Sequence, residues 1–150
     1  MDSRKTVLIT GCNPGGIGNS LAREFNSHGL RVLATARQTS SISDLADIGI
    51  ETFALEVTDS GSIAKLKEDV RLKTNGKLDY LVNNAGRNYT VAALDFDFDE
   101  VSATFDVNVV AVMRVCKEFA PLLIEAKGTI VQIGSLAGIM PYVSVTHSFT

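Results

Sequence analysis

Apolar residues form five short, nearly unbroken runs along this chain, and the longer segments between the runs carry them only at every third or fourth position. The runs are rich in Val, Ile and Leu and cover residues 5–10, 30–36, 50–57, the start of 78–86, and 128–135. An unbroken apolar run is typical of a strand that is covered on both faces, as in a parallel sheet. The pattern therefore predicts five buried parallel strands.

The segments between the runs have the period of amphipathic helices. Ile17, Leu21 and Phe25 recur every four residues after the first run, which predicts that they share the buried face of a helix. The segment Thr58-Asp59-Ser60 can cap the start of a second helix. A long helix is predicted over residues 99–127, with a buried side formed by Val101, Phe105, Val109, Val112 and Cys116.

Five strands that alternate with helices predict the α/β class. Strand–helix–strand units join parallel strands by right-handed crossovers, so they build an open, doubly wound parallel sheet. Sheets of this kind bind ligands beyond the carboxyl ends of their strands, where the strand order reverses. The unusual motifs of this chain follow predicted strands, which places them at that edge.

The first of these motifs is the glycine-rich stretch TGCNPGGIG, which follows the first strand and leads into a helix. Gly11 suits a tight turn, and Gly18 lets the helix pack closely against the strand. Either Gly15 or Gly16 allows the backbone to approach a phosphate group, which the free N–H groups of the helix then face. An ordinary strand-to-helix turn is the alternative, but four glycines within eight residues favour a nucleotide-binding loop.

The composition narrows the function classes. The chain has 150 residues, 45% of them hydrophobic and 21% charged, which suits one soluble globular domain. Its net charge of −3 and the lack of a Lys/Arg run argue against nucleic acid as a partner, and no apolar run reaches the ~20 residues of a membrane helix. Cys12 and Cys116 are interpreted as free thiols, which indicates a reducing, cytoplasmic location. With two histidines and no Cys/His cluster, the sequence predicts no metal site.

Three further motifs join the glycine loop in a resemblance to a known family. NNAG occupies residues 83–86, Asn108 lies in the long helix, and Ser135 follows the fifth run. In these motifs the chain resembles the short-chain dehydrogenase/reductase family, and its stretches GKLDYLVNNAG and KGTIVQIGSLAG are similar to fungal members of the acyl-dihydroxyacetone-phosphate reductase type. The resemblance covers residues 5 to about 142. It implies a Rossmann fold, of which the chain would hold the N-terminal five-strand portion, and an oxidoreductase with a nicotinamide cofactor.

The end of the second run favours NADP(H) over NAD(H). A carboxylate at this place binds the ribose 2′-OH of NAD and repels a 2′-phosphate, but no acidic residue occurs from Leu33 to Ser43. Arg37 instead offers a guanidinium that suits a phosphate group. The alternative is that Arg37 is a solvated surface charge.

The resemblance implies further cofactor contacts by position. Ile17 lies inside the glycine loop and is therefore expected to contact the cofactor. Glu56 takes the place of an acidic residue beside the adenine, which is usually Asp in the family, and Asn84 and Ala85 line the ribose side. Lys117 stands where some members have a cofactor-contacting base, and a solvated lysine is the alternative.

The resemblance also implies carbonyl reduction, in which the cofactor delivers a hydride and the protein supplies a proton. By position, Ser135 would hold the substrate oxygen and Asn108 would position a relay water. The family's proton donor is a Tyr about a dozen residues after the Ser, in a Tyr-x-x-x-Lys motif. That place holds His-Ser-Phe here, and no Lys follows Lys127. Tyr142 has no Lys nearby, and His147 lies close to the chain end.

The resemblance fades after residue 142, so we expect an incomplete Rossmann domain over 1–142 and a tail of unrelated sequence over 143–150. A retained intron is one hypothesis for that tail. Such a chain would expose its fifth strand as an apolar edge. Three functions stay open: an impaired or incompletely represented NADPH-dependent reductase of a ketone or secondary alcohol, an inactive NADP-binding or partner-binding chain, and a fragment without function. A homo- or hetero-oligomer would form through the 99–127 helix or the fifth-strand edge.

Overall fold

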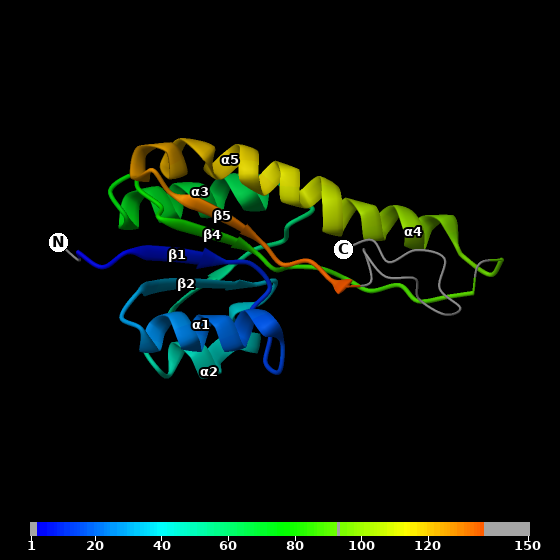
Figure 1. The fold of residues 1–150 in the computed structure, drawn as a ribbon, viewed down its shortest axis with the longest axis horizontal. Helices are drawn as coiled ribbons and strands as arrows, with labels where there is room; N and C mark the ends of the chain where they lie inside the picture. Colours follow the sequence, from blue (N-terminus) through cyan, green and yellow to red (C-terminus); the bar gives the residue numbers. More distant parts are fainter. Residues whose placement is uncertain (1–2, 93, 137–150) are drawn as a thin grey trace.

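The computed structural model describes residues 3–92 and 94–136, and its centre is a five-stranded parallel sheet (Figure 1). The strands lie in the order β3-β2-β1-β4-β5, so the direction of winding reverses between β1 and β4. They are β1 (Thr6–Ile9), β2 (Arg31–Ala36), β3 (Glu51–Ala54), β4 (Tyr80–Asn83) and β5 (Thr129–Gln132). All five predicted strands are present, and the doubly wound parallel sheet is confirmed. The predicted burial is correct for β1, β2 and β4, whereas β3 is mostly half-buried and β5 is mostly exposed.

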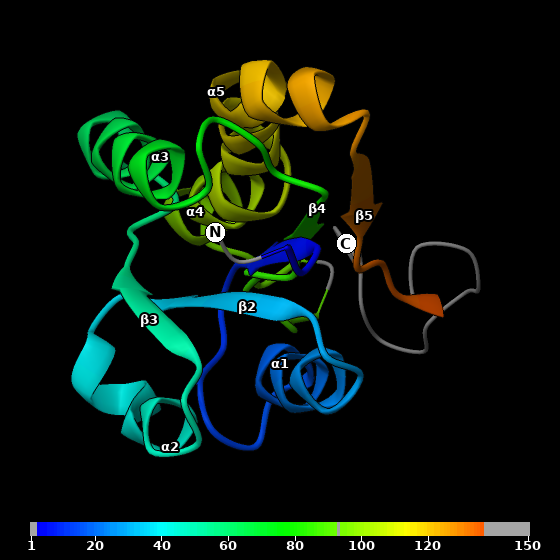
Figure 2. The same cartoon turned by 90° about the vertical axis from the view of Figure 1, so that its left-hand side faces the viewer.

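Helices cover both faces of this sheet (Figure 2). One face carries α1 (Ile17–Ser27), the 3-10 turn η1 (Thr39–Ile42) and α2 (Ser43–Ala46), and the other carries α3 (Ser60–Lys73) and α5 (Ala111–Ala126). Helix α4 (Phe98–Phe105) and a π-helical segment, η2 (Asp106–Val110), lead into α5 and lie in line with it (Figure 1).

Alternate residues of the central strand point to opposite helix layers, which explains why the apolar runs are unbroken. Val7 and Ile9 of β1 belong to a buried cluster with Ala22 of α1, whereas Leu8 packs in a second cluster with Phe119 of α5. All five side chains are fully buried. Burial of a side chain such as Leu8 or Phe119 contributes about 1.5–3 kcal/mol. A strand between two such layers has no face left for polar residues.

The predicted long helix over residues 99–127 is present as an unbroken helical stretch, in which α4, η2 and α5 follow one another from Phe98 to Ala126. Its predicted buried face is only partly correct: Val101, Val112 and Cys116 are half-buried, whereas Phe105 and Val109 are exposed. The observed buried face is offset by one residue from the predicted face, because Thr104, Ala111 and Val115 each lie one position before a predicted residue. One residue corresponds to a rotation of about 100° around an α-helix. The buried residues of this stretch are Thr104, Ala111, Val115, Phe119, Leu122 and Leu123.

The predicted buried face of the first helix is correct for two of its three residues. Leu21 and Phe25 are half-buried and pack against the cluster beneath α1. Ile17 is 60% exposed, because it opens the helix at the carboxyl edge of the sheet, in the wall of the cavity described below.

The predicted cap within residues 58–60 is present, and Asp59 is the residue that caps α3. Its carboxylate accepts hydrogen bonds from the backbone N–H groups of Gly61 at 3.0 Å and Ser62 at 3.1 Å. Asp59→Ala is expected to lower the free energy of unfolding by about 1 kcal/mol, because these N–H groups lose their acceptor. Urea denaturation followed by circular dichroism measures the change. The control Asp69→Ala removes the same charge inside the same helix and should change stability by less than ~0.5 kcal/mol; equal losses would contradict the capping role.

Strand β5 lies at one end of the sheet and, within residues 3–92 and 94–136, pairs with β4 alone. Its Ile130 is 44% exposed, so the apolar strand edge predicted from the sequence is present in the described part of the chain. None of the helices that the structure describes is long and apolar enough to cross a bilayer.

Candidate functional site

A cavity of about 800 Å³ opens at the carboxyl edge of the sheet, where the winding of the strands reverses. Parallel sheets bind ligands at this place, and the volume is within the ~300–1,000 Å³ typical of small-molecule sites. The wall comes from the glycine loop, the segments after β2, β3 and β4, and the α4–η2 junction. Its residues are Gly11, Asn13, Gly16, Ile17, Ala36, Arg37, Leu55, Glu56, Val57, Thr58, Asn84, Ala85, Gly86, Arg87, Ala103, Asp106 and Val107.

Gly11 and Gly18 are required by the close fit between the glycine loop and the segment after β4. Gly11 has a φ of +72°, and a Cβ added there would lie 2.8 Å from Cα of Ala85. A Cβ at Gly18 would lie 2.6 Å from the carbonyl oxygen of Gly11 and 2.5 Å from Nδ2 of Asn84. Side chains do not fit at such distances. The structure therefore agrees with the predicted tight turn at Gly11 and the close packing at Gly18.

Thr10 and Asn84 fasten the glycine loop to the end of β4. The Asn84 amide donates hydrogen bonds to the carbonyl oxygens of Thr10 at 2.8 Å and Gly11 at 2.9 Å. The Thr10 hydroxyl oxygen accepts from the backbone N–H groups of Asn84 at 3.0 Å and Ala85 at 2.9 Å. Asn84 and Ala85 both line the cavity, but the Asn84 amide is used within the protein, so this side chain supports the wall.

The start of α1 offers hydrogen-bond donors to the cavity. Gly16 is the N-cap of α1, and no side chain caps this helix, in contrast to α3 with its Asp59 cap. N–H groups at an uncapped helix start carry partial positive charge and favour an anion. Of the two glycines proposed for a phosphate, Gly16 lies in the cavity wall, and Gly15 supplies a turn with a φ of +75°.

Arg37 and Glu56 place opposite charges in the wall. Arg37 is exposed, and its side chain makes no ion pair or hydrogen bond with the residues that the structure describes, so its guanidinium is available to an anionic ligand. The Glu56 carboxylate accepts hydrogen bonds from the N–H of Thr58 at 3.2 Å and from its hydroxyl at 2.9 Å. These two hydrogen bonds hold the Glu56 carboxylate against Thr58, within the segment that follows β3.

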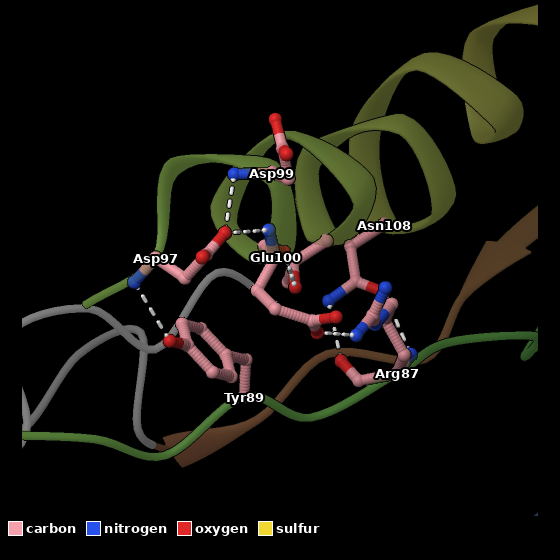
Figure 3. A network of polar contacts seen from close by, with 7 residues as sticks. Arg87, Tyr89, Asp97, Asp99, Glu100 and Asn108 are labelled. Atoms are coloured by element: carbon pink, nitrogen blue, oxygen red, sulfur yellow. Dashed lines mark hydrogen bonds and ion pairs between the residues drawn. The ribbon is translucent and has the colours of Figure 1, made fainter.

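Asn108 fixes the segment that leaves β4 (Figure 3). Its side-chain oxygen accepts from the N–H of Arg87, and its amide N–H donates to the carbonyl oxygen of Arg87, both at 2.9 Å. The Arg87 guanidinium forms an ion pair with Glu100 of α4. Asn108 is the middle residue of η2 and Arg87 lines the cavity, so the amide holds one side of the cavity wall in place.

Arg87, Tyr89 and Glu100 take part in this network without having been identified from the sequence. The Tyr89 hydroxyl oxygen accepts a hydrogen bond from the N–H of Asp97 at 2.9 Å, and the Asp97 carboxylate caps α4 (Figure 3). The one feature of the sequence that could have pointed to Arg87 is its position directly after the NNAG motif. Its pairing with Glu100 depends on where α4 lies, which the apolar period does not reveal.

Ser135 follows β5 and Lys117 lies on α5; both are exposed, and neither belongs to the described lining of the cavity. The predicted residues Gly15, Gly18 and Asn108 are not part of that lining either. Tyr142, His147 and the change of sequence expected after residue 142 lie outside the described residues. No group of three or more potential metal ligands occurs among the residues that were placed, 3–92 and 94–136.

Cys12 belongs to the glycine loop, is buried, and is expected to be an unreactive thiol. Its side chain is 0% exposed, and its thiol donates to the carbonyl oxygen of Ile9 at 3.4 Å. Burial raises the pKa of the Cys12 thiol to about 11, so the thiol is protonated at pH ~8. Alkylation by iodoacetamide, read by mass spectrometry, should modify Cys12 only after unfolding in urea. Rapid modification without urea would contradict a closed loop.

Comparison with known proteins finds relatives along nearly the whole chain. The protein-family model described as short chain dehydrogenase matches residues 5–147. The chain is 47% identical over 142 residues to the NADPH-dependent 1-acyldihydroxyacetone phosphate reductase of Schizosaccharomyces pombe, a match that covers 95% of this chain and 48% of that protein. The chain thus spans about half the length of the curated relatives it matches.

Solved structures share the fold. A short-chain dehydrogenase from Streptomyces avermitilis gives a TM-score of 0.86 at 31% identity, over 95% of this chain and 53% of that one. A metagenomic short-chain oxidoreductase, solved in complex with NADP, gives a TM-score of 0.81 at 33% identity, over 94% of this chain and 66% of that one.

Proposed function

Because this chain belongs to the short-chain dehydrogenase family, we propose that it is an NADP(H)-binding oxidoreductase chain that acts on a ketone or a secondary alcohol. One observation carries the proposal. The cavity at the strand ends combines a glycine loop and an uncapped helix start with the guanidinium of Arg37, which is unpaired among the described residues.

The residues of the cavity fit this dinucleotide. Gly11 and Gly18 let the loop pack closely against the segment after β4, and the N–H groups at the start of α1 suit the diphosphate. Arg37 suits the 2′-phosphate that distinguishes NADP from NAD. The Schizosaccharomyces pombe relative is named for its dependence on NADPH, and the metagenomic relative was solved with NADP, which supports the same cofactor here.

The chain's own residues would bind and orient the reactants. Bound NADPH supplies a hydride. Asn108 holds the backbone of Arg87 and thereby fixes the cavity wall after β4. Ser135, by its place after β5, would donate a hydrogen bond to the substrate oxygen.

The test is turnover of a ketone by the purified chain. The name of the Schizosaccharomyces pombe relative makes 1-acyldihydroxyacetone phosphate the first substrate to offer. Consumption of NADPH that Ser135→Ala removes, with NADPH affinity unchanged, supports a reductase. Consumption that is equally fast in the Ser135→Ala variant contradicts the role of this serine.

A second candidate is a chain that binds NADP(H) without turnover and acts through a partner. Apolar side chains exposed on α5 and β5 favour it: Met113 is 67%, Ile124 76% and Ile130 44% exposed. Such side chains suit a homo- or hetero-oligomer formed through this side of the molecule. NADPH binding without ketone reduction, together with self-association in analytical ultracentrifugation, supports this candidate. A chain that stays monomeric at ~100 μM contradicts a homo-oligomer of ordinary affinity.

A further inference from the structure

Arg114 lies behind the cavity and contacts two of its walls. Its Nη1 donates hydrogen bonds to Oδ1 of Asp106 at 2.9 Å and to the carbonyl oxygen of Thr58 at 3.3 Å. Asp106 and Thr58 both line the cavity, whereas Arg114 stands outside the lining. Arg114 therefore ties the segment after β3 to the π-helical segment η2.

The π-helical segment brings Asp106 and Arg114 to the same side of the helix. Two turns of a regular α-helix span about 7.2 residues, so Met113 would stand above Asp106. A π-helical turn takes up one residue more, which moves Arg114 into that place. Met113 is accordingly 67% exposed, and Arg114 pairs with Asp106.

The charges of the cavity wall make this ion pair significant for an anionic ligand. The charged side chains in the wall are Arg37, Arg87, Glu56 and Asp106. Arg87 is already paired with Glu100, which reduces its attraction for an anion. A carboxylate in the wall repels the phosphate groups of a dinucleotide unless a cation or hydrogen-bond donors compensate for its charge.

Arg114 acts on both carboxylates. It pairs with Asp106 directly, and it holds the carbonyl oxygen of Thr58. The N–H and hydroxyl of the same Thr58 donate to the Glu56 carboxylate. Loss of the Arg114 guanidinium would leave Asp106 without its cation and would release the residue that holds Glu56.

We propose that Arg114 is a positioning residue for dinucleotide binding. It neutralises Asp106 and joins the segment after β3 to η2, so that the cavity accepts an anionic cofactor. Arg114 itself does not contact that cofactor. This inference rests on the proposed binding of NADP(H).

The test is the affinity for NADPH of Arg114→Met, measured by the fluorescence of the reduced nicotinamide at low and high salt. We expect the Kd to rise about five- to tenfold at low salt, and by less at ~0.5 M salt, because salt screens the repulsion from Asp106. Adding Asp106→Asn to the variant should restore most of the affinity. The control Lys67→Met breaks the Lys67–Glu118 pair between α3 and α5, which does not line the cavity, and should leave the Kd unchanged.

Each outcome decides the proposal. An unchanged Kd in Arg114→Met overturns it, provided that the wild-type chain binds NADPH. A loss of NADPH affinity that is equal at both salt concentrations, and that Asp106→Asn does not restore, marks a structural effect alone and overturns the neutralising role. Thermal unfolding of each variant detects such a structural effect independently. A wild-type chain that binds no NADPH contradicts the proposed function and, with it, this inference.

Discussion

Arg37→Glu is expected to weaken NADPH binding about 100-fold while NADH binding changes by no more than about threefold. The Arg37 guanidinium stands in the cavity wall and makes no ion pair among the described residues, so the 2′-phosphate is its natural partner. A carboxylate at the end of β2 repels that phosphate and suits the ribose 2′-OH of NADH. Titration of each cofactor, followed by the fluorescence of reduced nicotinamide, measures both constants.

Two variants control this experiment. Arg37→Gln removes the cation without adding a repulsive charge, so its loss of NADPH affinity should be smaller. Lys65→Glu makes the same change of charge on α3, away from the cavity, and should leave both affinities within about twofold. Equal losses for NADPH and NADH in Arg37→Glu would show that the variant damages the fold or the shared part of the site, and would contradict recognition of the 2′-phosphate by Arg37.

Gly18→Ala is expected to abolish measurable NADPH binding and to lower the free energy of unfolding by about 1–3 kcal/mol. The added Cβ would lie 2.6 Å from the carbonyl oxygen of Gly11 and 2.5 Å from Nδ2 of Asn84. The backbone of the loop therefore has to shift, and the hydrogen bonds of Asn84 that fasten it to β4 are strained or lost. Cofactor titration and urea denaturation measure the two effects.

Gly61→Ala is the matched control, because it also adds a methyl group to a glycine near a helix N-terminus. A Cβ at Gly61 meets only the Asp59 carboxylate, at an ordinary distance of 3.5 Å. Its stability should stay the same or rise slightly, and NADPH binding should be unaffected. A Gly18→Ala chain that binds NADPH as well as the control would contradict the close packing of the loop.

The sheet was predictable because burial on both faces leaves a simple trace in the sequence. Every strand appeared as a nearly unbroken apolar run, and for the central strand the alternation of Val7, Leu8 and Ile9 between two helix layers explains why. The turn at Gly11 and the packing of Gly18 were predictable for a similar reason, since only glycine fits those places.

The course of the α4–η2–α5 stretch was not predictable from the apolar period. The π-helical turn at residues 106–110 leaves no mark in the apolar pattern. The predicted buried face was also offset by one residue before that turn, where Thr104 is buried and Phe105 is exposed.

The polar contacts of the cavity escaped prediction for a different reason. Arg87 meets Glu100, and Arg114 meets Asp106 and Thr58, across distances in sequence that only the packed fold makes short. Charged side chains are solvated in most proteins, so the sequence alone favours a solvated surface position for Arg87, Glu100, Asp106 and Arg114. Arg37 was identifiable because it follows a strand where an acidic residue would have indicated NAD.

Direct titration of the purified 150-residue chain with NADPH and, in parallel, with NADH tests the central claim that its own cavity binds NADP(H). The account predicts saturable binding of one NADPH per chain, with a Kd at least about tenfold lower than that for NADH, because only NADPH offers a phosphate to Arg37. Absence of saturable binding, or equal binding of the two cofactors, would contradict it.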